Sequence, residues 1–141
     1  EKTPLVKDRL YQLLASTEDV ALARRALELA LTSEPGSTNS AGMIAAVSNL
    51  HPDLAFDFAL AHRADVDAKV DASSRTRYFA ILADGSSDPA MIGKVNAYAK
   101  KYLAEGSRRD ADTAVNAISA RIRIRTESLP EVDKWLSGKG L

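Results

Sequence analysis

The stretch DPAMIGKVNAYAKKYL, residues 88–103, decides the fold class of this chain. Asp88 can accept hydrogen bonds from the free N–H groups at a helix start, and Pro89 suits the first helical position, where no N–H is needed. The apolar residues that follow recur at three- and four-residue spacing, the period of an amphipathic helix. They are Ile92, Val95, Ala99, Tyr102 and Leu103. The stretch therefore predicts a helix with one buried face.

Seven other segments show helical spacing and are separated by short polar breaks. Near the end, Ser128 and Glu131 have the spacing of a capping box, which predicts a separate last helix. We expect an all-α fold of about eight helices arranged as antiparallel pairs. The seven segments begin at Pro4, after Asp19, after the loop 33–37, at Pro52, after Ser73-Ser74, after the break 105–107 and after Ser128.

Three prolines that open helices suggest a repeat. Pro52, Pro89 and Pro130 are separated by 37 and 41 residues, close to the roughly 40-residue period of HEAT-type helix pairs. The sequence around the prolines is otherwise dissimilar, so the repeat is one of architecture. We predict a single helical-repeat domain over residues 1–141, stacked as a HEAT/armadillo-like α-solenoid.

The first helix carries an apolar stripe at three- and four-residue spacing. The stripe consists of Leu5, Val6, Leu10, Leu13 and Leu14. A stacked array also needs a capping end, and Leu5, Val6 and Tyr11 can serve as a face for an upstream helix. On that interpretation the chain is a piece of a longer protein.

The segment RIRIR at 121–125 allows two structures. Its strict alternation is typical of an edge strand. The upstream apolar stripe, however, reaches Ile122 at helical spacing, and no partner strand is evident. We therefore predict a helix.

Composition excludes several classes of protein. Lys+Arg and Asp+Glu number 19 each, and this zero net charge argues against a nucleic-acid binder. No apolar run approaches 18 residues, so no membrane span is expected. The chain has no cysteine, which excludes thiolate chemistry and cysteine-based zinc sites and is compatible with either the cytoplasm or the periplasm.

Catalytic and metal-binding motifs are not found. His51 and His62 are eleven residues apart, about 16 Å along a helix, which is too far to share a metal. The sequence lacks His-Glu-x-x-His, Gly-x-Ser-x-Gly and phosphate-binding glycine motifs. We expect no catalytic residue, no metal ligand and no cofactor in this chain.

Arginines are the candidate binding residues. Arg75 and Arg77 lie at a predicted helix start, where the helix dipole favours anions, and such local inconsistencies can mark binding sites. Pairing with Asp71 is the simpler interpretation. Arg121 and Arg125 share a helix face at i,i+4 spacing. Either pair can bind the carboxylates of a peptide.

Several segments, in this order, resemble the C-terminal helical domain of the aminopeptidase N family of zinc peptidases. The match is closest to the puromycin-sensitive branch and its bacterial relatives. Departures include Phe56 where the family usually has Trp, and Tyr98-Ala99 in place of a paired aromatic. The similar segments are LALTSE (29–34), MIAAV (43–47), HPDLAFDF (51–58), Arg77 with ILADG (81–85), MIGKVNAY (91–98), Ala117-Ile118 and VDKWL (132–136).

The resemblance implies a non-catalytic C-terminal fragment of a larger multidomain enzyme, a zinc-dependent aminopeptidase. Zinc and the catalytic residues would belong to a separate domain of the same polypeptide, the partner of this chain. This helical domain would form a wall of the substrate chamber, assist peptide binding and gate access. The resemblance favours Arg77, with Arg75, as contacts for peptide substrates, and Arg121 and Arg125 as a second pair.

Two other functions stay open. A stand-alone helical-repeat scaffold that binds peptides or proteins fits the same pattern. A small helical enzyme that uses carboxylates, or a helical regulator, fits less well, since a regulator would be expected to carry a basic recognition helix.

Overall fold

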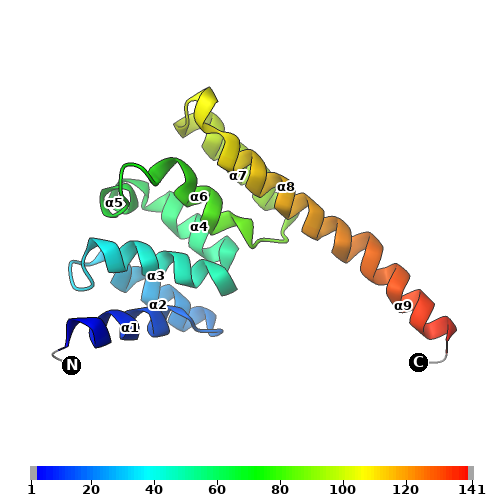
Figure 1. Ribbon diagram of the computed structural model, residues 1–141, viewed down its shortest axis with the longest axis horizontal. Helices are drawn as coiled ribbons and strands as arrows, with labels where there is room; N and C mark the ends of the chain where they lie inside the picture. Colours follow the sequence, from blue (N-terminus) through cyan, green and yellow to red (C-terminus); the bar gives the residue numbers. More distant parts are fainter. Residues whose placement is uncertain (1–2, 140–141) are drawn as a thin grey trace.

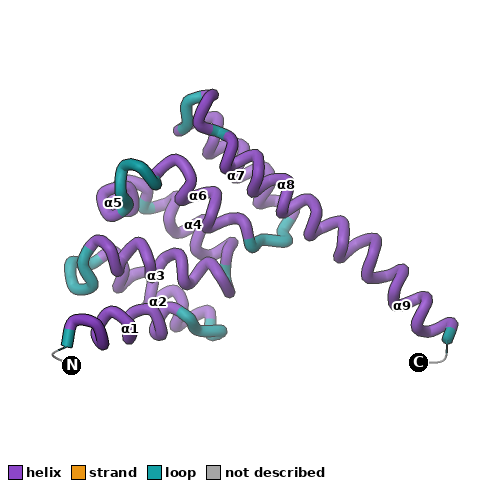
Figure 2. Tube along the Cα trace, in the orientation of Figure 1, coloured by secondary structure: helices purple, strands orange, loops and turns teal. Residues whose placement is uncertain are grey.

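The computed structural model describes residues 3–139, and this part of the chain contains helices, turns and connections but no strand (Figure 2). The prediction of an all-α fold is confirmed. The elements are α1 (Pro4–Ala15), α2 (Val20–Leu31), α3 (Ser37–Leu50), α4 (Pro52–Ala61), α5 (Arg63–Lys69), α6 (Arg75–Asp84), α7 (Pro89–Tyr102), the 3-10 turn η1 (Glu105–Ser107), α8 (Arg109–Arg123), the π turn η2 (Ile124–Ser128) and α9 (Leu129–Gly138).

The helices stack as an α-solenoid in two layers (Figure 1). Helices α1, α3, α6 and α8 pack one after another in the first layer, and α2, α4 and α7 follow in the second. Neighbours in sequence form antiparallel pairs because their connections are short. Each pair therefore buries its apolar side chains against the next pair, as the predicted repeat requires.

Two helix starts form as the sequence predicts. The carboxylate of Asp19 accepts hydrogen bonds from the N–H groups of Ala21 and Leu22, at 2.7 and 3.0 Å. Asp88 accepts one from the N–H of Ala90 at 2.9 Å, with Pro89 in the first turn of α7. Such caps satisfy N–H groups that the helix itself leaves without partners.

Three aromatic rings join the two layers at the centre of the stack. Phe79 of α6 stacks on Tyr98 of α7, with 4.5 Å between ring centroids. Phe56 of α4 meets both rings edge-on, at 6.2 and 6.3 Å. Phe56 and Phe79 are completely buried. The cluster holds three helices in contact through geometries that aromatic rings favour.

The α6–α7 connection is held by a buried hydroxyl. Ser86 is fully buried, and its Oγ donates a hydrogen bond to Oδ1 of Asp53 at 2.6 Å. The same Oγ accepts a hydrogen bond from the N–H of Asp88 at 3.0 Å. The connection is thereby fixed to the start of α4.

The apolar stripe on α1 is largely exposed, and of the residues expected to form a face for an upstream helix, Leu5 and Val6 are exposed but Tyr11 is not. Leu5, Leu13 and Leu14 are exposed over 78%, 60% and 56% of their surfaces, whereas Tyr11 and Ala15 are buried against α3. Helix α1 lies at the end of the described stack, so only the side that faces α2 and α3 is covered. The remaining stripe lies on the outside, as expected of a face without a neighbouring helix.

The predicted number of about eight helices is confirmed, but two helix boundaries differ from the prediction. The acidic stretch after Ala61 forms a helix of its own, α5, which the sequence did not indicate. The predicted break at Ser128 does not occur, because Ser128 has helical dihedral angles and α8 continues through η2 into α9. Counting this continuous rod once, the described residues form eight helical units.

The rod settles the alternatives at RIRIR in favour of a helix. Pro130 lacks an N–H and its ring crowds the preceding turn. The wider π turn at Ile124–Ser128 lies just before it, which lets the helix pass the proline without ending.

The described part of the chain holds no helix whose length and apolarity would let it cross a lipid bilayer.

Truncating the central ring tests the role of the aromatic cluster. We expect Phe79→Ala to lower the free energy of unfolding by about 3–5 kcal/mol, since it leaves a cavity between three helices. Ile81→Ala, on the same helix but 52% exposed, is the control and should cost less than about 1 kcal/mol. Urea denaturation followed by circular dichroism measures both. Equal losses would contradict the central role of the cluster.

Alkaline pH should destabilise the fold through two buried tyrosines. Burial raises the pKa of Tyr98 to about 12, with Asp67 adding to the effect, and burial also raises the pKa of Tyr78. The stabilisation is fully present below the unfolded tyrosine pKa of about 10 and is lost as pH rises toward 12, because only the unfolded chain releases these protons. Unfolding free energies at pH 9, 10 and 11 should therefore fall, and fall less in Tyr98→Phe. Identical pH profiles would contradict this assignment.

Candidate functional site

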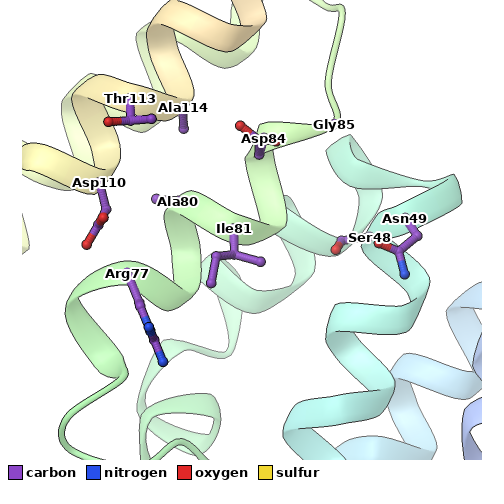
Figure 3. Close-up of a pocket in the computed structure, with 10 residues that line it drawn as sticks. All are labelled: Ser48, Asn49, Arg77, Ala80, Ile81, Asp84, Gly85, Asp110, Thr113 and Ala114. Atoms are coloured by element: carbon purple, nitrogen blue, oxygen red, sulfur yellow. The ribbon is translucent and has the colours of Figure 1, made fainter.

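A hollow of about 410 Å³ lies where α3, α6 and α8 meet (Figure 3). We call it the α3–α6–α8 hollow. Its lining combines a few apolar side chains with charged and amide groups from three helices. Its lining consists of Ser48, Asn49, Arg77, Ala80, Ile81, Asp84, Gly85, Asp110, Thr113 and Ala114.

Helix α6 supplies the central wall of the hollow. Arg77, Ala80, Ile81 and Asp84 recur at three- and four-residue spacing, so they share one face of this helix. In Figure 3, Ile81 lies between Arg77 and Asp110 on one side and Ser48 and Asn49 on the other. Ile81 is 52% exposed because it faces the hollow.

The charges of the hollow are mixed. Arg77 contributes one cation, and Asp84 and Asp110 contribute two carboxylates. The guanidinium of Arg77 donates a long hydrogen bond of 3.4 Å to Oγ of Ser74. Within residues 3–139 the ion pairs are Arg63–Asp67 and Lys94–Asp57, so Arg77 has no ion pair with Asp71. Arg77 therefore keeps donors for a carboxylate, while the two aspartates can accept from backbone N–H groups or an amine.

Arg75 lies apart from the hollow. Its Nε donates a hydrogen bond to the carbonyl oxygen of Val70 at 3.1 Å, and it forms no ion pair with Asp71 within the described residues. The two neighbouring arginines thus have different surroundings: Arg77 lines the hollow and Arg75 holds the turn before α6. The substrate-binding role of both residues stays a prediction.

Arg121 and Arg125 reach the same connection, between α6 and α7. Nη1 of Arg121 donates to the carbonyl oxygens of Asp84 and Ser86, both at 2.7 Å. Nη1 of Arg125 donates to Oγ of Ser87 at 2.5 Å. Both arginines hold α8 against the connection that ends at the hollow. Their role as substrate contacts stays a prediction, and a peptide would have to compete with these hydrogen bonds.

Sequence reasoning missed most of the hollow. Asn49, Asp84 and Asp110 come from three helices that are distant in sequence, so no short motif joins them. One signal was present: Asp84 follows Arg77 by seven residues, which places both on one face of a helix. The positions of Asn49 and Asp110 depend on how the helices stack.

A second group missed from the sequence surrounds Tyr102. The guanidinium of Arg63 lies 4.1 Å from the centroid of its ring, and Nζ of Lys101 lies 5.0 Å away. Arg63 also pairs with Asp67 at 3.0 Å. The contact of Arg63 with Tyr102 connects α5 to α7, while the fully buried Val66 packs α5 into the core, so this group accounts for structure rather than for binding.

The two histidines have separate structural surroundings. His51 precedes α4, and its Nε2 lies 2.9 Å from the carbonyl oxygen of Thr17. The ring of His62 packs on that of Phe58, with 4.6 Å between centroids. In the range 3–139, no three His, Asp or Glu side chains gather in a group that could hold a metal ion.

Removing Arg121 tests how the hollow is held together. We expect Arg121→Ala to lower the free energy of unfolding by about 1–3 kcal/mol, because two carbonyl oxygens lose a charged donor. Arg123→Ala is the matched control, since Arg123 lies on the same helix and is exposed. Chemical denaturation measures both. Equal effects of the two substitutions would show that the hydrogen bonds of Arg121 contribute little.

Comparison of the chain with protein families, with curated proteins and with solved structures finds no match.

Proposed function

We propose that this chain is the non-catalytic C-terminal domain of a zinc-dependent aminopeptidase. It forms a wall of the substrate chamber, assists peptide binding and gates access. The observation that carries the proposal is the α3–α6–α8 hollow, in which Arg77 faces a space shared with two carboxylates. The ordered segments that resemble the aminopeptidase N family support the same function.

The hollow suits a peptide better than a small apolar ligand. Arg77 can bind a terminal or side-chain carboxylate through two parallel hydrogen bonds. Asp84, Asp110 and Asn49 offer acceptors to the peptide N–H groups, and Ile81 offers apolar surface between them. A hollow with these groups can hold the distal part of a peptide while its other end reacts elsewhere.

Peptide cleavage is assigned to the partner domain of the same polypeptide. The resemblance to the aminopeptidase N family is what places zinc in that other domain. In this proposal the chain contributes peptide binding, and α8 holds the lining of the hollow in position. Opening and closing of such a wall would control which peptides enter.

The coding sequence that precedes Glu1 gives the first test. The proposal expects a reading frame that encodes His-Glu-x-x-His upstream of this domain. A natural start codon directly before Glu1 would contradict it and would favour the stand-alone peptide-binding scaffold, for which the same hollow would serve.

Length-dependent kinetics of the whole enzyme test the role of Arg77. We expect Arg77→Ala to raise KM about tenfold for longer peptides, because the loss of one charged contact costs about 1.4 kcal/mol, and to leave KM for aminoacyl reporter substrates unchanged. Arg24→Ala, an exposed arginine on α2, is the control. If Arg77→Ala left the preference for peptide length unchanged, Arg77 would not be a contact for peptide substrates.

A further inference from the structure

Helix α9 is an amphipathic helix whose main contacts within residues 3–139 are with η2, the preceding part of its own rod. It continues the rod of α8 away from the stacked pairs and ends far from α1 (Figure 1). Leu129 and Val132 are each 50% exposed, and Leu136 is partly exposed. These three residues have i, i+3, i+7 spacing and therefore form one apolar stripe.

The opposite end of the molecule carries a matching surface. A groove of about 380 Å³ lies on the outer side of the first helix pair, and we call it the α1–α2 groove. Leu14 and Leu22 are 56% and 48% exposed, so the groove offers apolar side chains to solvent. The groove is lined by Leu14, Leu22, Arg25, Ala26 and Leu29.

The two surfaces agree in length. Leu22 and Leu29 are seven residues apart on α2, as are Leu129 and Leu136 on α9. At 1.5 Å per residue, each pair spans about 10.5 Å along its helix axis. A helix that enters a groove is held by anchors at this spacing.

The two surfaces also agree in charge. The segment 22–29 carries Arg24, Arg25 and Glu28, a net charge of +1, and α9 carries Glu131, Asp133 and Lys134, a net charge of −1. With the helices antiparallel, Leu136 lies level with Leu22. Asp133 then lies level with Arg25, because each is three residues from those leucines.

The structure assigns α9 to the α1–α2 groove of a second copy of this chain, antiparallel to α2, with Asp133 beside Arg25. A chain cannot fill its own groove in this way. Its α9 continues α8, which Arg121 and Arg125 fasten to the α6–α7 connection. Each chain offers one α9 and one groove, so a reciprocal exchange buries both surfaces and closes a dimer.

This inference is independent of the peptide-binding function. The α1–α2 groove and α9 share no residue with the α3–α6–α8 hollow. Substitutions in one surface therefore leave the other unchanged, and failure of either proposal is recognisable by itself.

Sedimentation velocity of the 141-residue chain over a concentration series tests the dimer. We expect self-association that weakens at least about tenfold in Val132→Asp, on α9, and in Leu22→Glu, in the groove. Both positions are half-exposed, so the monomer fold is retained, which circular dichroism checks. The controls are Glu131→Lys, on the far side of α9, and Leu5→Glu, which is exposed but outside the groove.

Mixing the two defective variants gives the decisive result. Leu22→Glu keeps a functional α9 and Val132→Asp keeps a functional groove, so an equimolar mixture should form heterodimers through one intact contact. The charge exchange Arg25→Asp with Asp133→Arg should restore association that each single substitution weakens.

Three outcomes would overturn the inference. The first is a chain that stays monomeric at every concentration. The second is association that Val132→Asp abolishes but Leu22→Glu does not, which would indicate contact between two α9 helices. The third is a charge exchange that restores nothing, which would exclude the antiparallel alignment with Asp133 beside Arg25.

Discussion

Each helix pair of this chain can bury its apolar residues only against the neighbouring pair. The rest of the structure follows from this constraint. In the centre, Phe56, Phe79 and Tyr98 meet from three helices and leave no exposed apolar ring. At the two ends of the stack the described residues contain no further helix pair, and Leu14 of α1 and Val132 of α9 are exposed. A repeat stack is therefore well packed inside and exposes apolar side chains at both ends.

The connection between α6 and α7 links the core to the candidate site. Ser86 fixes it to α4 through Asp53, and Arg121 fixes it to α8 through two carbonyl oxygens. Asp84 and Gly85, at the edge of the hollow, belong to this segment. Arg121, predicted as part of the second pair of substrate contacts, thus holds the segment that borders the hollow. Arg77 lines the hollow itself and forms no ion pair within the described residues.

The proposed peptide-binding wall and the proposed dimer depend on different surfaces that the helix stack creates. The hollow arises where three helices of one layer leave space between their side chains. The α1–α2 groove and the stripe on α9 arise where the layers end. A wall of this kind can take part in binding without any catalytic residue, because its contribution is the position of charged and amide groups.

Local features of the fold could be predicted from the sequence. The caps at Asp19 and Asp88 and the helical period of each segment depend on residues within one or two turns, so reading the chain in order is sufficient. The prediction failed where tertiary packing or backbone adjustment decided. Most of the stripe on α1 is exposed, and the π turn carries the rod past Pro130. Helix α5 is held by the buried side chain of Val66 and by the contact of Arg63 with Tyr102.

The sequence by itself determined that this chain is a series of amphipathic helices in pairs, because helix formation, capping and turn chemistry act over a few residues. Only the tertiary structure decided which apolar faces are covered and which charges share a hollow. Asn49, Arg77 and Asp110 meet there although 61 positions separate the first from the last. Their meeting depends on how whole helices stack, and no spacing along the chain records it.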